Sequence, residues 1–220
     1  MFKVLSYNDT YMPLLCLILY IILWKDIDKK DRVWFYFFIY NILLYGCTNV
    51  LGKFYINNLV LYHFANWIEL MFVVFIIARA ITGQNFSRQF WLINIPSTLF
   101  CVIDIVYWEP WNTFNSIASG YAYLIIIIYS MYFLFDLSKS DKILYFQKLP
   151  IFWFVSAFLV YCTISLLAMA SYRYFLTQKL QEQSLNVLTV NVIAIFIKFA
   201  MISIGLLCYK RPNTQIRSLL

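Results

Sequence analysis

The stretch Val60–Ile81, VLYHFANWIELMFVVFIIARAI, decides the fold class of this chain. A helix needs about 20 mainly apolar residues to cross the hydrocarbon core of a bilayer, and this stretch is long enough. His63, Asn66 and Glu69 interrupt it at three-residue steps, a spacing that forms a slanting polar stripe on a helix. The stretch therefore predicts a membrane-spanning helix that carries a carboxylate to membrane depth.

The composition of the whole chain also indicates a membrane protein. Of its 220 residues, 63% are hydrophobic, 21% are aromatic and only 12% are charged, and the mean hydropathy is +0.75. Soluble domains usually carry about 25% charged residues. This chain has too little polar surface to cover a soluble globule, so the lipid bilayer is its expected partner. The net charge of +7 then reflects membrane topology, and no nucleic-acid partner is predicted.

Seven apolar runs of spanning length predict an all-α integral membrane protein, a seven-transmembrane-helix bundle that occupies residues 1–220 as a single domain. The first run has no small-residue cleavage site, and KDIDKKDR follows it directly, so it should remain as a helix. The loops are short, which favours antiparallel neighbours. The expected spans are approximately residues 7–24, 33–51, 60–81, 90–107, 116–137, 150–172 and 186–209.

The distribution of Lys and Arg predicts how the bundle is oriented. Twelve of these residues fall in loops and tail on one side, four fall on the other side, and Lys198 lies inside the last span. Positive residues collect on the cytoplasmic side, which predicts an outside N-terminus and a cytoplasmic C-terminus in a bacterial inner membrane. The twelve are Lys25, Lys29, Lys30, Arg32, Arg79, Arg88, Lys139, Lys142, Lys148, Lys210, Arg211 and Arg217, and the four are Lys3, Lys53, Arg173 and Lys179.

Four acidic, basic or histidine residues lie at least three positions inside the predicted spans: His63, Glu69, Asp104 and Lys198. Each costs about 2.5–3.5 kcal/mol at the helix centre when charged, so each should point inward, pair or neutralise. A rise of about 1.5 Å per residue places His63 near the outer surface and Asp104 about 5 Å below it. By the same rise, Glu69 lies about 13 Å deep and Lys198 about 18 Å deep.

Further polar residues fall mostly in the outer half of the predicted bundle: Asn41, Thr48, Asn49, Asn115, Ser116, Ser119 and Asn191. This pattern predicts a ligand or ion pocket that opens outward and narrows inward. Its expected residues are His63, Asn66, Glu69, Asp104, Lys198, Asn41 and Asn191. The alternative is that these groups only satisfy one another through interhelical hydrogen bonds.

Glu69 and Lys198 differ in predicted depth by only a few ångströms. They form an ion pair if their helices touch. Otherwise Lys198 snorkels toward the cytoplasmic face, or Glu69 is protonated. The sequence leaves these alternatives open.

Metal and redox chemistry find no support in the sequence. The five cysteines all lie in apolar runs without a C-x-x-C spacing, and the chain has one histidine. A disulfide framework, a metal site and a cofactor are therefore not predicted, and no residue is assigned a catalytic role.

Several motifs resemble those of small seven-helix membrane proteins common in Bacteroidota. The third run carries Y-x-x-x-x-x-I-E from Tyr62 to Glu69. The likeness continues through FNSIASGYAYLIIIIYSMYF, LPIFWFVSAFLVY and NVLTVNVIAIFIKFAM, so it spans nearly the whole chain on loose motifs. The resemblance implies a seven-helix fold and no particular activity. Glu69 and Trp153 match family positions, whereas the family has an apolar or small polar residue in place of Lys198.

These observations favour a non-enzymatic multi-pass membrane module. It would sense a small molecule or lipid through the outer pocket, or form the membrane subunit of a signalling or defence assembly. Because the loops are short, a protein partner is expected at the cytoplasmic loops or tail.

Three alternatives stay open. A small transporter or ion pathway would use Glu69, Asp104 and Lys198, although the chain has no inverted repeat. A metal-free lipid hydrolase would need Glu69 and Asp104 at one water. A retinal protein would form its Schiff base at Lys198.

Overall fold

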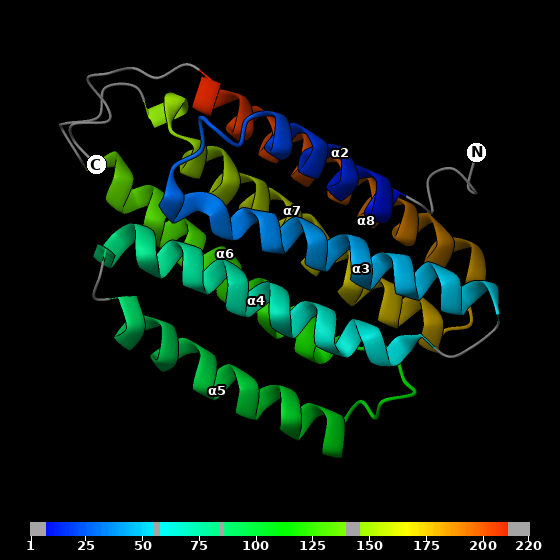
Figure 1. Ribbon diagram of the computed structural model, residues 1–220. Helices are drawn as coiled ribbons and strands as arrows, with labels where there is room; N and C mark the ends of the chain where they lie inside the picture. Colours follow the sequence, from blue (N-terminus) through cyan, green and yellow to red (C-terminus); the bar gives the residue numbers. More distant parts are fainter. Residues whose placement is uncertain (1–7, 55–57, 84–85, 140–145, 211–220) are drawn as a thin grey trace.

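The computed structural model describes residues 8–54, 58–83, 86–139 and 146–210, which are entirely helical apart from turns and loops (Figure 1). The α-helices are α2 (Asn8–Ile22), α3 (Val33–Lys53), α4 (Leu59–Thr82), α5 (Phe86–Tyr107), α6 (Ile117–Ser138), α7 (Pro150–Thr177) and α8 (Gln181–Leu207). Short 3-10 helices are η1 (Lys29–Arg32), η3 (Phe146–Lys148) and η4 (Cys208–Lys210).

Six of the described helices, α3 to α8, are long and apolar enough to cross a membrane. α2 is also apolar but has only 15 residues, about 22 Å, whereas the hydrocarbon core is about 30 Å thick. The structure therefore supports six spanning helices and a shorter seventh helix, rather than the seven full spans expected from the sequence. Tyr7, where the first span was expected to begin, lies outside the described residues.

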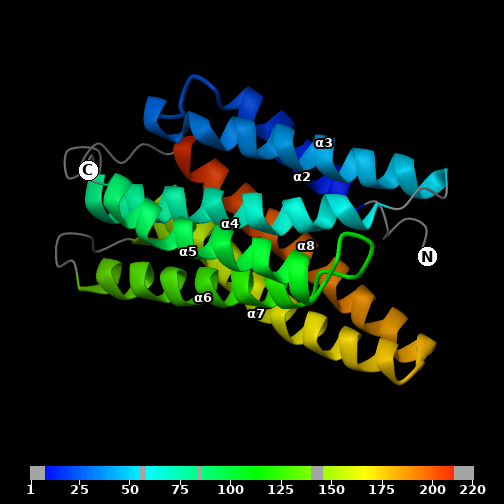
Figure 2. The same ribbon diagram turned by 90° about the horizontal axis from the view of Figure 1, so that it is seen from below.

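Consecutive helices run in alternate directions along one common axis (Figures 1 and 2). α3, α4, α6, α7, α8 and α2 pack in that order around the bundle, and α2 closes it by contacting both α8 and α3. α5 lies at the edge and packs mainly against α4. Its apolar residues, such as Leu92 and Leu99, are largely exposed, as expected for a lipid-facing helix.

The alternation divides the loops between two ends of the bundle. We call one the basic end, because it holds Lys25, Lys29, Lys30, Arg32, Arg79, Arg88, Lys139, Lys148 and Lys210. The opposite end holds Lys53, Arg173 and Lys179 among the described residues. Lys3, Lys142, Arg211 and Arg217, which entered the sequence-based count, lie outside the described residues.

The half of the bundle nearest the basic end is filled by aromatic rings. Trp34 is the centre of this cluster, with its ring centroid 4.3 Å from Phe154 and 5.2 Å from Phe72. Phe37 stacks on Phe72 at 4.5 Å, and Phe158 lies within 6.2 Å of Trp34. These rings come from α3, α4 and α7, so the aromatic cluster locks three helices together.

α7 and α8 form the closest pair, a hairpin joined by residues 178–180 that diverges from the other helices at the opposite end (Figure 2). Their close approach near the basic end requires Gly205. A Cβ placed there would lie 2.6 Å from Cε1 of Phe154 and 3.0 Å from Cβ of Trp153. Phe154 is buried against Trp34 and has no room to move aside.

We expect Gly205→Ala to lower the melting temperature of the protein in detergent, because the added methyl group pushes α7 from α8 at a cost of about 1–3 kcal/mol. Gly46→Ala is the matched control, since nothing lies within 4 Å of its added Cβ. That control should be neutral or stabilising, because alanine favours a helix over glycine by about 1 kcal/mol. Equal melting temperatures for the two variants would contradict the close packing at Gly205.

Candidate functional site

Glu69 and Lys198 form an ion pair in the interior of the bundle. Nζ of Lys198 donates to Oε1 of Glu69 at 2.7 Å, with the lysine side chain 0% and the glutamate side chain 7% exposed. Glu69 comes from α4 and Lys198 from α8, two helices that are not close neighbours in the bundle. The side chains therefore meet across the interior and connect its two sides. Of the three arrangements that the sequence left open, the structure contains the ion pair.

Aromatic rings surround the ammonium group of Lys198. Its Nζ lies 3.9 Å from the ring centroid of Tyr161, 5.1 Å from Phe199 and 5.6 Å from Phe158. The contact with Glu69 is the one hydrogen bond of this ammonium among the described residues. Cation–π attraction thus compensates part of the lost hydration.

A chain of hydrogen bonds begins beside this pair, at Tyr161, and runs toward the opposite end. The hydroxyl of Tyr123 lies 3.4 Å from that of Tyr161 and donates to Oδ1 of Asn66 at 3.3 Å. Nδ2 of Asn66 donates to the hydroxyl of Ser119 at 2.5 Å. Since the Tyr123 proton goes to Asn66, Tyr161 is the donor between the two tyrosines. The chain links α4, α6 and α7 just above the ion pair.

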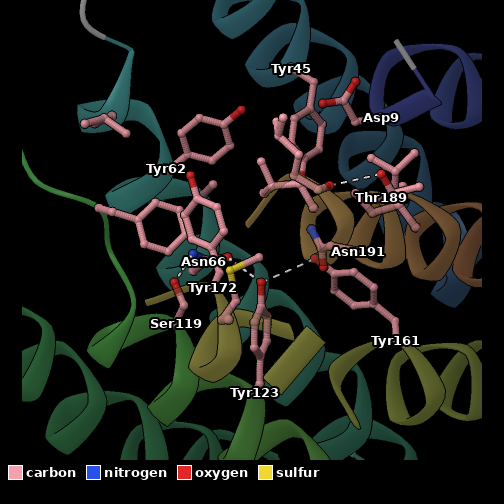
Figure 3. A pocket seen from close by; sticks show the side chains of 18 residues that line it. Asp9, Tyr45, Tyr62, Asn66, Ser119, Tyr123, Tyr161, Tyr172, Thr189 and Asn191 are labelled. Carbon is pink, nitrogen blue, oxygen red and sulfur yellow. Dashed lines mark hydrogen bonds between the residues drawn. The ribbon is translucent and has the colours of Figure 1, made fainter. Parts of the chain in front are cut away.

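A cavity of about 420 Å³ lies directly above this chain (Figure 3). Its floor includes the buried Tyr123 and Tyr161, and its rim includes the partly exposed Tyr62, Phe114 and Tyr172. The rim residues lie where α4 begins, before α6 begins and where α7 ends, so the cavity opens at the opposite end and narrows toward the ion pair. The other lining residues are Asp9, Tyr45, Leu59, Ala65, Asn66, Ser119, Met169, Leu185, Leu188, Thr189, Asn191, Val192 and Ile195.

The structure does not gather all seven predicted pocket residues in one place. Asn66 and Asn191 line the cavity, and Asn191 accepts a hydrogen bond from Ser165 at 2.7 Å. Glu69 and Lys198 pair one helical turn below the lining residues Asn66 and Ile195. Four of the predicted residues thus belong to the cavity and the layer beneath it.

The other three predicted residues face elsewhere. His63 donates from Nε2 to the carbonyl of Thr113 at 3.3 Å, in the loop before α6. Asn41 donates to the carbonyl of Phe37 in its own helix at 2.8 Å. Helix geometry explains why His63 lies away from the cavity. Each three-residue step along α4 rotates the side-chain direction by about 60°, so Glu69 faces the interior while His63, two steps earlier, faces the loop.

Asp104 is buried on α5, which contributes no residue to the cavity. Its carboxylate oxygens make no hydrogen bond of standard geometry among the described residues, although the backbone N–H of Ala118 interacts with the carboxylate. The charged groups near it are Glu109 and Arg173, and Glu69 is not among them. The two carboxylates that a metal-free hydrolase would need are therefore not brought together.

Glu109 organises a second polar cluster that the sequence did not single out. Its carboxylate accepts from the backbone N–H of Ser116 and Ile117 at 2.7 and 2.8 Å, which caps the N-terminus of α6. Arg173 of α7 donates to Glu109 at 2.7 Å, and the Ser116 hydroxyl also donates to it. This cluster ties the loop before α6 to α7 beside the rim.

Sequence reasoning missed the tyrosines, because they are common in this chain and none interrupts an apolar run. The spacing of polar residues on two helices could nevertheless have predicted part of the cavity lining. Tyr62, Asn66 and Glu69 follow an i, i+4, i+7 pattern on α4, and Asn191, Ile195 and Lys198 repeat it on α8. Each pattern places one helix face along the cavity and down to the ion pair.

Apart from its tyrosines, the described lining of the cavity contains few ionisable side chains. Among the lining residues, Asp9 is the one carboxylate, and there is no histidine, cysteine, lysine or arginine. In the part of the chain that the structure describes, no group of three or more His, Cys, Asp and Glu residues is arranged to hold a metal ion. A general-base partner for Asp9 is therefore absent from the lining.

Fold and cavity together define a helical protein with six helices apolar and long enough to cross a membrane and with an internal cavity. Comparison of the chain with protein-family models, with curated proteins and with solved structures gave no match.

We expect Glu69→Gln and Lys198→Met each to lower the melting temperature in detergent, because each leaves its partner buried and unpaired at a cost of about 3–5 kcal/mol. The double variant should recover part of the loss, since it leaves no unpaired charge. Losses that simply add would show that the two side chains do not interact in the folded protein.

Proposed function

We propose that this protein is a non-enzymatic, multi-pass module of a bacterial inner membrane that binds a small molecule or lipid from the outer side. The observation that carries the proposal is the cavity of about 420 Å³ at the end of the bundle away from the basic residues. Its size falls within the range of about 300–1,000 Å³ typical of small-molecule sites.

The charge distribution supports the outward orientation of the cavity. Nine described Lys and Arg residues lie at the basic end, whereas Lys53, Arg173 and Lys179 lie at the opposite end. In the proposed orientation the basic end faces the cytoplasm, as the positive-inside rule requires. The N-terminus is then outside and the C-terminus cytoplasmic.

The surface of α2 supports a seventh helix inside the membrane. Its apolar side chains, such as Leu15, Ile18 and Ile22, are 58%, 48% and 72% exposed. Such a face is stable against lipid and costly against water. Local thinning of the bilayer and snorkelling side chains accommodate a short hydrophobic helix at modest cost.

Closure of the cavity toward the basic end favours binding over transport. Below the Glu69–Lys198 pair, the interior is filled by the aromatic cluster of Trp34, Phe37, Phe72, Phe154 and Phe158. A transport path would have to open this packed layer, which holds α3, α4 and α7 together. Binding from the outer side needs no such rearrangement.

Any output of this module would pass to another protein. The loops at the basic end are short and contain no separate domain in the described residues. We therefore propose a protein partner at the cytoplasmic loops or tail, as in a signalling or defence assembly.

Topology can be tested with reporters fused to the chain in bacterial cells. A reporter active only in the periplasm should be silent after Leu220 and active when inserted in the loop before α6, near Thr113. A cytoplasmic reporter should give the reverse pattern. Exchange of the two patterns would overturn the orientation derived from the basic end.

Access to the cavity can be tested by thiol labelling in intact cells. In a chain carrying Cys47→Ala and Cys208→Ala, Thr189→Cys should react with a membrane-impermeant maleimide, because Thr189 lines the outward-opening cavity. Thr163→Cys is the matched control, because Thr163 is exposed on the flank of α7 and should face lipid. Labelling of Thr189→Cys only after cells are permeabilised would contradict an outward-facing site.

A further inference from the structure

The lining of the cavity is electron-rich and carries one acidic charge. Six aromatic side chains contribute to it: Tyr45, Tyr62, Phe114, Tyr123, Tyr161 and Tyr172. The faces of such rings present negative potential, and several rings around one site attract a cation. Among the described residues that line the cavity there is no lysine, arginine or histidine, so none of these lining side chains offsets the potential.

Asp9 supplies the charge, and it lies in the first turn of α2 at the outward end of the cavity. Its side chain lies beside Tyr45, and its charge acts on both Tyr45 and Tyr62 (Figure 3). Asn49 and Thr10 interact with the Asp9 carboxylate, but its Oδ1 is buried and has no hydrogen-bond partner among the described residues. A buried carboxylate oxygen without a donor is costly, and a bound cation would satisfy it.

The deeper charges do not cancel this preference. Lys198 lies one turn below the lining residue Ile195, and its charge is balanced by Glu69 at 2.7 Å. The charges beneath the floor of the cavity are therefore paired and nearly neutral. The rim, in contrast, is acidic and rich in tyrosine. Between them the walls are apolar, with Met169, Val192 and Ile195 facing the space.

From this arrangement we infer that the cavity binds a small organic cation, a primary amine or quaternary ammonium with an apolar body. The positive group lies against Asp9, Tyr45 and Tyr62, and the apolar body points inward toward Met169 and Ile195. The inference rests on the proposed function, because it names the ligand class of the same cavity.

The size of the cavity separates this ligand from a membrane lipid. About 420 Å³ accommodates an amine with a compact aromatic or aliphatic body. A two-chain phospholipid would leave most of its acyl chains outside. The positive group of such a ligand binds at the rim of the cavity. Water there can hydrate the cation as it enters and leaves.

Three water-soluble probes of matched shape test the charge preference: phenethylamine, phenethyl alcohol and phenylacetate. Isothermal titration of the full chain in an uncharged detergent at neutral pH should give the amine at least about tenfold tighter binding than the alcohol. Phenylacetate should not bind measurably. Equal affinities of amine and alcohol, or tighter binding of phenylacetate, would overturn the inference.

Two pairs of variants assign the preference to named residues. Asp9→Asn should weaken amine binding about tenfold without changing alcohol binding, whereas Asp136→Asn, an exposed aspartate at the basic end, should change neither. Tyr62→Leu should weaken amine binding several-fold, and Tyr62→Phe, which keeps the ring face, should retain it. An unchanged amine affinity in both Asp9→Asn and Tyr62→Leu would count against the assignment.

A cavity-filling variant separates failure of the ligand class from failure of the proposed function. Thr189→Phe should abolish binding of both amine and alcohol, and Thr163→Phe, on the exposed flank of α7, should not. If the alcohol binds as well as the amine and Thr189→Phe abolishes both, the cavity is a binding site but not a cation site. If no probe binds, or Thr189→Phe leaves binding intact, both the ligand class and the proposed cavity function are wrong.

Discussion

The buried ion pair between Glu69 and Lys198 is the constraint on which the interior of this bundle depends. Neither charge can stay in a low-dielectric interior alone, because the cost of desolvation is several kcal/mol per ion. The 2.7 Å contact therefore fixes the register of α4 against α8, two helices that share few direct contacts. It also fixes Tyr161, whose ring covers the ammonium at 3.9 Å. Because Tyr161 forms part of the cavity floor, the pair determines where the cavity ends.

This layer separates two halves of the bundle with different packing. Toward the basic end, Trp34 and the rings around it pack against one another in the interior, and Gly205 lets α8 approach Phe154. Toward the opposite end, the interior is lined by tyrosines and amides that bond to one another, as Tyr123 and Asn66 do. The cavity lies in this half, where polar side chains bond to one another. The division between a closed half and an open half thus follows from which side chains each half contains.

Much of the fold could be predicted from the sequence, and less of the site. Long apolar runs identify α3 to α8, because backbone groups in lipid must be satisfied within a helix. α2 was harder, since hydropathy alone does not reveal that its described helix has 15 residues. For the site, the depth calculated along each helix predicts that Glu69 and Lys198 lie at similar levels. Whether the two side chains meet depends on how α4 and α8 pack, which the sequence does not reveal. His63 and Asp104 have suitable depth, yet rotation about α4 and the peripheral place of α5 direct them away from the cavity. The tyrosines were hidden by their number, because composition does not distinguish a ring facing lipid from one facing the interior.

A ligand in the cavity could influence the basic end only through contacts that differ between two states of the bundle. The aromatic cluster is tightly packed, so it does not deform gradually. The hydrogen-bond chain from Asn66 through Tyr123 to Tyr161, together with the contact of the Tyr161 ring with Lys198, connects the cavity to the ion pair. Tyr161 contacts both the cavity floor and the ion pair, because its hydroxyl bonds to Tyr123 while its ring covers Lys198. A ligand that displaces the Tyr161 hydroxyl would move the Tyr161 ring away from the Lys198 ammonium. The ion pair that joins α4 and α8 would then change as well. The group that closes the cavity is thus also the group through which binding would reach the rest of the bundle.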